Sequence, residues 1–455
     1  MIRQAFMSAT LCCVTLVNFA VAQPLYLSTF KADVTPPLGT ALCDGGVKPG
    51  KVVVDPLTVR GVVLQGEGNE PIVLCAIDWV GIGNEGYDAW RSALADAAGT
   101  SAQRVALHAL HQHDTPGCDF AAGRLLAEYG LENKMYDETF AREAIRRAAL
   151  ALKTGLSERR RVTHVGVGRA NVERFASNRR ILGPDEKVAH MRFTSCADHA
   201  YCAEPEGVID PELDLISFWD EEKPVVSITY YATHPQSFYA RGAISTDTVG
   251  LARGLREATL PNVFHMHFNG AGGNIGAGKY NNGDPKHRMA LANRLADGMS
   301  RAWDQIDKHP IDWANIDWRV EPVALPLGEH LEENTERAIV ADESREERVR
   351  IFAARNMIWI RRCLEGHQID LSCLHIGPAR VVHMPGELFV EYQLFAKQLH
   401  PGTFTTMAAY GDYGPGYIGT EESYPQGGYE TGPASRVAPQ VEQLLHHSIR
   451  RLLAP

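Results

Sequence analysis

The sequence has no dense run of lysine or arginine. Its 455 residues carry 45 Lys+Arg against 55 Asp+Glu, which gives a formal net charge of -10. Proteins that bind nucleic acid or anionic lipid headgroups through charge need a concentrated basic patch. We therefore expect no nucleic-acid partner, and we expect any contact with a membrane surface to be transient.

Low-complexity linkers and internal repeats are also absent. With 45% apolar and 22% charged residues, the composition excludes disorder, collagen and coiled coil, since each of these needs a strong bias toward a few residue types. The length alone allows two or three domains. Because no Pro/Ser-rich boundary divides the chain, we expect residues 23–455 to form one catalytic domain.

Long apolar runs are missing everywhere except at the start of the chain. Arg3 precedes a largely apolar run over residues 5–20, which ends in Ala20-Val-Ala22. A positive charge, a short apolar stretch and a small-x-small end are the parts of a secretory signal peptide. We expect residues 1–22 to be removed and the protein to be periplasmic or secreted. The alternative is a membrane anchor, for which the run is short.

Cysteine is scarce, with nine residues and no C-x-x-C pair of the kind found in zinc knuckles. Removal of the signal peptide would leave seven, so at least one thiol would stay unpaired. Cys196 with Cys202, and Cys363 with Cys373, are close enough in sequence to form disulfides, whereas Cys75 lies in an apolar run that predicts a buried strand. The cysteines are therefore predicted to form disulfides or to lie in the core, and not to bind a metal.

Strand and helix patterns alternate along the chain, which predicts an α/β protein with a mixed β-sheet core and helices packed on its faces. Strands are predicted at 57–64, 71–78, 104–110, 162–167, 215–219, 225–232, 263–268, 379–384 and 403–410. Helices are predicted at 87–97, 138–152, 249–258, 287–304 and about 437–452. The segment 332–363, dense in Glu and Arg at helical spacing, predicts one long solvated helix without a functional role.

The densest group of candidate metal ligands is His108-Ala-Leu-His-Gln-His-Asp-Thr-Pro-Gly117, at the end of the strand predicted at 104–110. Alternate side chains of a strand share a face, so His111 and His113 can project into one site. Imidazole is a good zinc ligand. His108 points to the opposite face and is interpreted as a packing residue. The alternative for the whole group is a histidine-rich surface turn.

Three weaker signals lie at other strand ends. His234 follows an apolar run and precedes Pro235. The alternative is a structural histidine whose ring nitrogens are hydrogen-bonded within the fold, as is common for a single histidine. Glu387 follows a strand and a Pro-Gly turn, where an acid is also favoured by the dipole of the next helix. A Gly-rich segment from Asp412 to Glu430 carries tyrosines whose hydroxyls need partners. Together these segments supply nitrogen and oxygen ligands from four strand-to-loop transitions, which predicts a metal site at one rim of the sheet.

These segments resemble the catalytic domain of the neutral ceramidases, zinc amidases that split ceramide into sphingosine and a fatty acid. The resemblance rests on the following stretches: Ala32-Asp-Val-Thr-Pro36, Val54-Asp-Pro-Leu57, Ile77-Asp78, His111-Gln-His-Asp-Thr-Pro-Gly117, Ser177-Asn-Arg179, His234-Pro235 with Ser245-Thr-Asp247, Pro385-Gly-Glu387, and Tyr417-Ile-Gly-Thr-Glu-Glu-Ser-Tyr-Pro-Gln-Gly-Gly-Tyr-Glu430. In order and spacing they span nearly all of residues 23–455.

The resemblance implies a zinc-dependent amidohydrolase that acts on a ceramide-like lipid or another small molecule, and it implies no protein partner. The implied zinc ligands are His111, His234, Glu387 and Tyr417. The implied catalytic residues are His113, which transfers protons, and Tyr429 and Arg179, which stabilise the oxyanion.

Two departures from the family pattern bear on the substrate. Gly276 stands where the family has its serine, so we expect a wider pocket and a substrate other than ceramide. The sequence also ends at Pro455 without the immunoglobulin-like C-terminal domain of full-length ceramidases. Two alternatives therefore stay open. One is an exported zinc hydrolase of another amide or ester, and the other is an inactive homologue that only binds its ligand.

Overall fold

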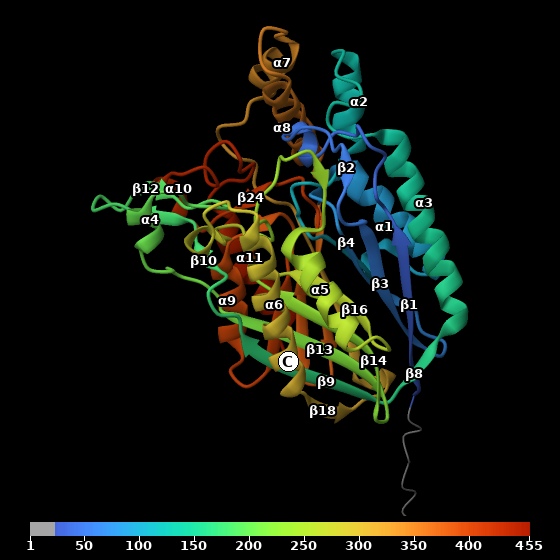
Figure 1. The fold of residues 1–455 in the computed structure, drawn as a ribbon. Coiled ribbons are helices and arrows are strands. Elements are labelled where there is room, and N and C mark those ends of the chain that lie inside the picture. Colours follow the sequence, from blue (N-terminus) through green and yellow to red (C-terminus); the bar gives the residue numbers. More distant parts are fainter. Residues whose placement is uncertain (1–22) are drawn as a thin grey trace, which may run out of the picture.

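The computed structural model describes residues 23–455, which are built around three β-sheets of four or five strands with helices packed against them (Figure 1). The signal peptide predicted at 1–22 lies outside the described residues and stays a prediction. None of the helices in residues 23–455 combines the length and the hydropathy needed to cross a membrane.

The first sheet has the order β6-β4-β3-β1-β8, in which β4 and β6 are parallel and the other neighbours antiparallel. Gly61 in β3 faces the ring of Phe30, and a side chain there would collide with that ring. Helices α1 and α3 pack on this sheet. The elements are β1 (Leu25–Asp33), β3 (Thr58–Gly66), β4 (Ile72–Ile77), β6 (Val105–Ala109), β8 (Arg160–Val162), α1 (Asn84–Ala98) and α3 (Glu138–Gly155).

The second and third sheets have the orders β16-β14-β13-β9-β18 and β19-β20-β21-β23. Helices α5 and α6 pack on the second sheet, and α9 and α11 on the third. The second sheet and its helices are β9 (His164–Asn171), β13 (Glu212–Asp220), β14 (Lys223–Tyr231), β16 (Phe264–Asn269), β18 (Asp307–Pro310), α5 (Asp247–Thr259) and α6 (Lys286–Asp304). The third comprises β19 (Ile316–Val323), β20 (Ile369–Ile376), β21 (Ala379–His383), β23 (Phe404–Ala408), α9 (Val390–Leu399) and α11 (Val441–Leu453).

The three sheets share one feature of topology, although the sequence shows no repeat. In each sheet a strand pairs antiparallel with its predecessor and then, through a connection that contains a helix, leads to a parallel neighbour. These units are β4-α1-β6, β14-α5-β16 and β21-α9-β23. Functional residues in α/β proteins gather in the loops after the carboxyl ends of parallel strands, so this topology provides three sets of loops for a site.

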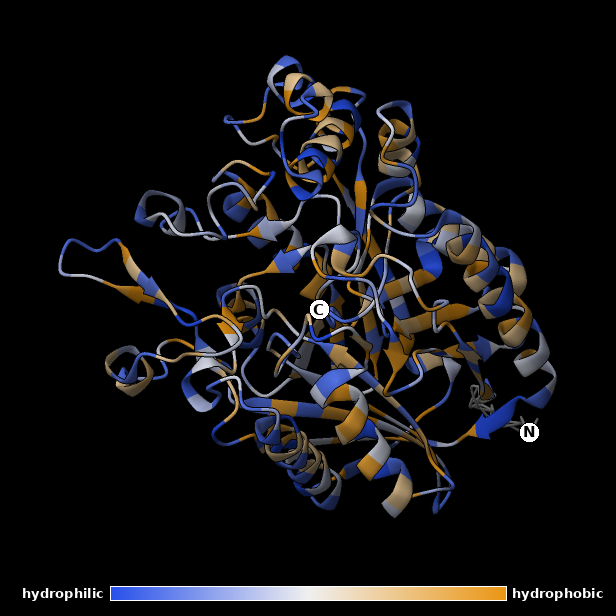
Figure 2. Cartoon of the chain, turned by 45° about the horizontal axis from the view of Figure 1, so that its top comes forward, coloured by the Kyte–Doolittle hydropathy of each residue, from blue (hydrophilic) through white to orange (hydrophobic). Residues whose placement is uncertain are grey.

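Apolar residues are concentrated in the strands and along one side of the helices, as the hydropathy colours of Figure 2 show, and many of them are buried. Helix α3 illustrates the pattern, because its buried residues Phe140, Ala144, Ala148 and Leu152 recur every four positions and face the first sheet. The mixed sheets with helices on their faces confirm the predicted fold class.

The structure differs from the sequence prediction at one long segment. Residues 332–363 form two helices, α7 (Glu333–Ala341) and α8 (Glu347–Leu364), and most of α8 is buried. The prediction of one solvated helix is wrong because the apolar residues between its charges, such as Ile351 and Met357, pack into the core. The sequence analysis also did not identify β1, β19 or α2 (Phe120–Glu128), and the strand predicted at 162–167 is divided between β8 and β9.

The cysteine predictions have mixed outcomes. Cys196 and Cys202 form a disulfide, and Cys75 is buried in β4 as expected. Within residues 23–455, Cys363 and Cys373 are both free thiols, so the prediction that they pair is wrong. Cys373 is buried in β20, where its side chain packs among apolar residues of the third sheet.

A buried ion pair joins the first sheet to the helix of the second. Asp78 follows β4, is completely buried, and accepts hydrogen bonds from Arg253 of α5 at 2.8 and 3.1 Å. The backbone N–H and hydroxyl of Thr58 and the side-chain amide of Gln112 also donate to this carboxylate. Burial alone would raise the pKa of Asp78, but Arg253 and Thr58 hold it below its ordinary value. The carboxylate therefore fixes the loop that contains Gln112.

Removal of Arg253 should destabilise the protein strongly, because it leaves the Asp78 carboxylate buried without its charged partner. We expect Arg253→Met to lower the free energy of unfolding by about 3–5 kcal/mol, measured by urea denaturation. The control Arg337→Met breaks an exposed ion pair with Glu333 and should cost less than about 1 kcal/mol. Equal losses in the two variants would contradict the role assigned to the buried pair.

Candidate metal centre

Three buried side chains from different sheets meet at one point. The ligand atoms of His111, His234 and Glu387 all lie within 4.8 Å of one another. Glu387 Oε2 is 3.2 Å from Nε2 of His111 and 3.0 Å from Nε2 of His234. The side chains are no more than 4% exposed, so the group is shielded from bulk solvent.

His111 reaches this point through its backbone conformation. The strand β6 ends at Ala109, and His111 adopts a φ of 58°, in the left-handed region that is uncommon for residues with a side chain. The strand-alternation argument for the His111 and His113 pair is therefore wrong, although both side chains do converge. The turn is held by the backbone of Trp79, which accepts from His111 N–H, and by Gln236, which donates to the His111 carbonyl.

Glu387 and Tyr417 are brought together by a short parallel ladder. They are paired residues of β22 (Glu387–Leu388) and β24 (Tyr417–Ile418), which follow β21 and β23. The backbone of Glu387 passes directly over Gly273, where a Cβ atom would collide with the Glu387 carbonyl. His234 lies beyond the end of β14. The ligands thus come from the loops after parallel strands of all three sheets, as the topology predicts.

The hydrogen bonds of the two histidines determine which ring nitrogen faces the centre. Nδ1 of His111 lies 2.6 Å from the Val80 carbonyl, and Nδ1 of His234 lies 2.7 Å from the Gly272 carbonyl. Because a carbonyl oxygen only accepts, Nδ1 carries the proton in each neutral ring and Nε2 presents a lone pair. Metal-ligating histidines are held in this way by backbone carbonyls.

This arrangement leaves three acceptors facing one another. Two Nε2 lone pairs and the Glu387 carboxylate have no proton to share when the histidines are neutral, and such a group is stabilised by a cation. Burial, with the charge of Arg179, lowers the pKa of His234 to about 4, which favours the neutral ring. The donor set of two nitrogens and a carboxylate fits zinc.

Tyr417 and Arg179 lie beside this group. The Tyr417 hydroxyl is 3.2 Å from His234 Nε2 and 3.4 Å from a guanidinium nitrogen of Arg179. Arg179 also approaches His234 Nε2 at 3.1 Å and forms an ion pair of 3.0 Å with the fully buried Glu430. Tyr417 therefore places a hydroxyl oxygen beside the three-residue group, and Arg179, whose charge is balanced by Glu430, lies next to it.

The centre opens into a cavity of about 360 Å³. His113 lies in its wall with Nε2 3.3 Å from His111 Nε2, while its Nδ1 has no hydrogen-bond partner among the described residues. Burial and the neighbouring His111 lower the pKa of His113 well below its usual value. Tyr429 is 37% exposed at the mouth, with its ring 5.7 Å from that of Tyr417. All the predicted site residues line this cavity: His111, His113, Arg179, His234, Glu387, Tyr417 and Tyr429.

Several residues of the cavity were not identified from the sequence. Tyr413 donates a hydrogen bond of 2.8 Å to Glu387 Oε1, and Asp44 forms an ion pair of 2.8 Å with Arg355 in the cavity wall. Arg355 comes from α8, so the segment that was predicted to be a solvated helix contributes charged residues to the cavity wall. Other residues of α8 in the wall are Arg348, Ile351 and Phe352.

Gly276 does not widen the pocket. It belongs to the short strand β17 (Ile275–Gly276), which pairs with β10 (Ser177–Asn178), and it is not among the residues that line the cavity. A Cβ atom at Gly276 would meet the Phe193 carbonyl at 3.2 Å and the side chain of Arg179 at 3.3 Å. The expectation of a wider pocket is wrong because Arg179 and the backbone of Phe193 already occupy the space.

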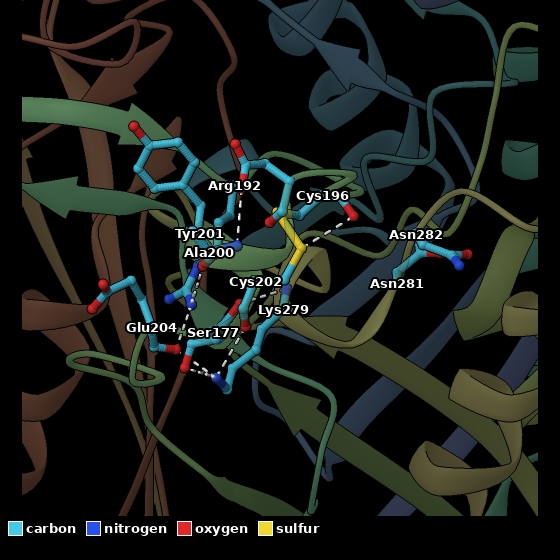
Figure 3. The surroundings of a disulfide bond; sticks show 12 residues. Ser177, Arg192, Cys196, Ala200, Tyr201, Cys202, Glu204, Lys279, Asn281 and Asn282 are labelled. Carbon is cyan, nitrogen blue, oxygen red and sulfur yellow. Dashed lines mark hydrogen bonds between the residues drawn. A yellow bond between two sulfur atoms is a disulfide. The ribbon is translucent and has the colours of Figure 1, made fainter.

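One wall of the mouth belongs to a segment held by the disulfide. Phe193 and Thr194 line the cavity just before Cys196. Figure 3 shows that two cations bind the backbone of this segment: Lys279 donates to carbonyls that include that of Cys202, and Arg192 donates to those of Tyr201 and Glu204. The disulfide and these cations together fix the position of the wall. The segment includes α4 (His199–Ala203), and the hairpin of β11 (Arg180–Leu182) and β12 (Val188–Met191) precedes it.

No protein-family model matches this sequence, and no curated protein matches it. Solved structures do. The crystal structure of neutral ceramidase from Pseudomonas aeruginosa has a TM-score of 0.67 with this chain at 14% identity, covering 94% of this chain and 73% of that one. A ceramidase complexed with C2 gives the same TM-score and identity, with 94% and 74% covered. The chain therefore has the fold of neutral ceramidase, as the sequence resemblance predicts.

The convergence of these ligands predicts a bound metal. We expect the purified protein to contain about one zinc ion per chain, measured by inductively coupled plasma mass spectrometry. His111→Ala and Glu387→Gln should each reduce the zinc content at least tenfold, since second-sphere changes alone cost 10–100-fold in affinity. The control His309→Ala alters a partly exposed histidine and should keep the full content. Full zinc in His111→Ala would contradict this assignment.

Proposed function

We propose that the protein is a zinc-dependent amidohydrolase that cleaves the amide bond of an N-acyl, ceramide-like substrate with water as the nucleophile. The observation that carries the proposal is the buried set of His111, His234 and Glu387, whose lone pairs face one point at the base of an open cavity. The fold of neutral ceramidase supports it. Gly276 supplies no hydroxyl, which favours water over a serine nucleophile.

His111, His234, Glu387 and Tyr417 would hold the zinc ion. When bound, zinc polarises a carbonyl oxygen and lowers the pKa of water, which makes amide hydrolysis feasible near neutral pH. Tyr413 and the Val80 carbonyl fix the orientation of Glu387 and His111. Such outer contacts determine ligand geometry and affinity.

The remaining residues handle protons and developing charge. His113 accepts a proton from the attacking water and returns it to the nitrogen of the leaving amine as the carbon–nitrogen bond breaks, because its neutral ring lies beside His111 at the cavity wall. Tyr429 donates a hydrogen bond to the carbonyl oxygen as that oxygen becomes negative. Arg179 adds positive charge beside Tyr417, where Glu430 keeps its guanidinium in place.

The acyl chain would lie against the apolar part of the cavity wall. Val47, Val80, Phe193, Ile351 and Phe352 contribute this surface. Ligand sites of this kind combine an apolar lining with a few convergent polar groups. The same arrangement could serve another amide or an ester.

We also propose that the protein is exported after removal of residues 1–22. The Cys196–Cys202 disulfide supports this proposal, since structural disulfides persist in oxidising compartments and are rare in the cytosol. The location fits a hydrolase whose substrate comes from outside the cell or from a membrane surface.

Substitution of Tyr429 should separate catalysis from binding. We expect the zinc-loaded protein to release fatty acid from N-acyl amides, and Tyr429→Phe to lower kcat about 100-fold with little change in KM, because one donor to the oxyanion is lost. The control Tyr26→Phe lies in β1 of the first sheet and should leave kcat unchanged. Fatty-acid release is followed by liquid chromatography and mass spectrometry. A zinc-loaded protein that cleaves no N-acyl amide would contradict the proposed function.

A further inference from the structure

One positive charge at the cavity mouth has no counterion. Three arginines line the cavity, and two of them are paired: Arg179 with Glu430 at 3.0 Å and Arg355 with Asp44 at 2.8 Å. Arg348 forms no ion pair with any residue of 23–455. The acid next to it in sequence, Glu347, binds Lys134 at 3.0 Å instead.

Arg348 lies where it can meet a ligand. It belongs to the first turn of α8, is exposed, and lies against Gly46, so that a Cβ atom on this glycine would be 3.8 Å from its Nε. Arg348 and Tyr429 both line the cavity and are both exposed, so they belong to one rim.

The charges of the cavity favour an anion at this rim. Asp44 and Glu387 are the acidic residues that line it. Asp44 is neutralised by Arg355, and Glu387 belongs to the candidate metal-binding group with His111 and His234. A divalent cation there would carry two positive charges, of which the Glu387 carboxylate would neutralise one. Arg348 adds a further positive charge. A guanidinium binds carboxylate or phosphate through a planar pair of donors, and an uncharged ceramide offers neither group.

We propose that Arg348 binds an anionic group of the substrate, so that the substrate class is an N-acyl amide whose amine portion carries a carboxylate or a phosphate. This inference rests on the proposed function. The apolar residues next to Arg348, namely Ile351 and Phe352, place an acyl chain and an anion side by side. Arg348 is then the residue that selects among N-acyl amides.

Three substrates with one acyl chain test the inference: N-lauroylglycine, N-lauroylethanolamine and N-lauroyl-phosphoethanolamine. We expect the wild-type protein to prefer one or both anionic compounds over the neutral one, and the preferred compound identifies carboxylate or phosphate. Arg348→Gln should raise KM for the anionic compounds at least tenfold, as expected for loss of a charged hydrogen bond, and should leave the neutral compound unchanged. Arg348→Lys should restore part of the preference.

The control Arg345→Gln removes a charge of the same sign that is paired with Asp342 outside the cavity, and it should change none of the three KM values. Equal use of all three compounds by the wild type, with no effect of Arg348→Gln, would overturn the inference and leave the proposed function intact. Failure to cleave any of them would overturn the proposed function. Calorimetric binding of N-lauroylglycine then decides the role of Arg348: tenfold weaker binding to Arg348→Gln supports it, and equal binding refutes it.

Discussion

The candidate metal site, and the function that we propose from it, depend on the contact of one carboxylate with two imidazole lone pairs. Glu387 lies about 3 Å from Nε2 of His111 and of His234, and both rings carry their proton on the nitrogen that binds a backbone carbonyl. Three acceptors at such distances are unfavourable in a buried site unless a cation lies among them. The hydrolase chemistry that we propose depends on this requirement for a cation.

The fold satisfies the requirement by bringing three sheets to one point. Each sheet ends in a parallel strand pair, and the loops beyond these pairs carry the ligands. The Asp78–Arg253 pair holds the first of these loops through Gln112, which lies between His111 and His113. The disulfide-bearing segment and α8 then form the walls of the cavity. The candidate metal ligands and the mouth of the cavity are consequently positioned by different parts of the chain.

The sequence was sufficient to predict the α/β class, most strands of the three large sheets, most of the helices packed on them, and residues that do come together, because strand ends, residue types and the ceramidase resemblance are local signals. The sequence did not reveal the backbone conformation at the site or the packing of side chains around it. The left-handed turn at His111 has no glycine to mark it, and the space near Gly276 is filled by Arg179, which is far away in sequence. The burial of α8 was hidden because its charged residues are interleaved with the apolar ones, and two of them, Arg350 and Arg355, are themselves buried.

The most direct test of the central claim is a crystal structure of the protein purified without chelators, with anomalous diffraction recorded on both sides of the zinc absorption edge. The account predicts one strong zinc peak at about 2.0–2.2 Å from Nε2 of His111, Nε2 of His234 and a carboxylate oxygen of Glu387. A zinc-replete crystal with no peak at this point, in which the histidines donate hydrogen bonds directly to Glu387, would contradict it.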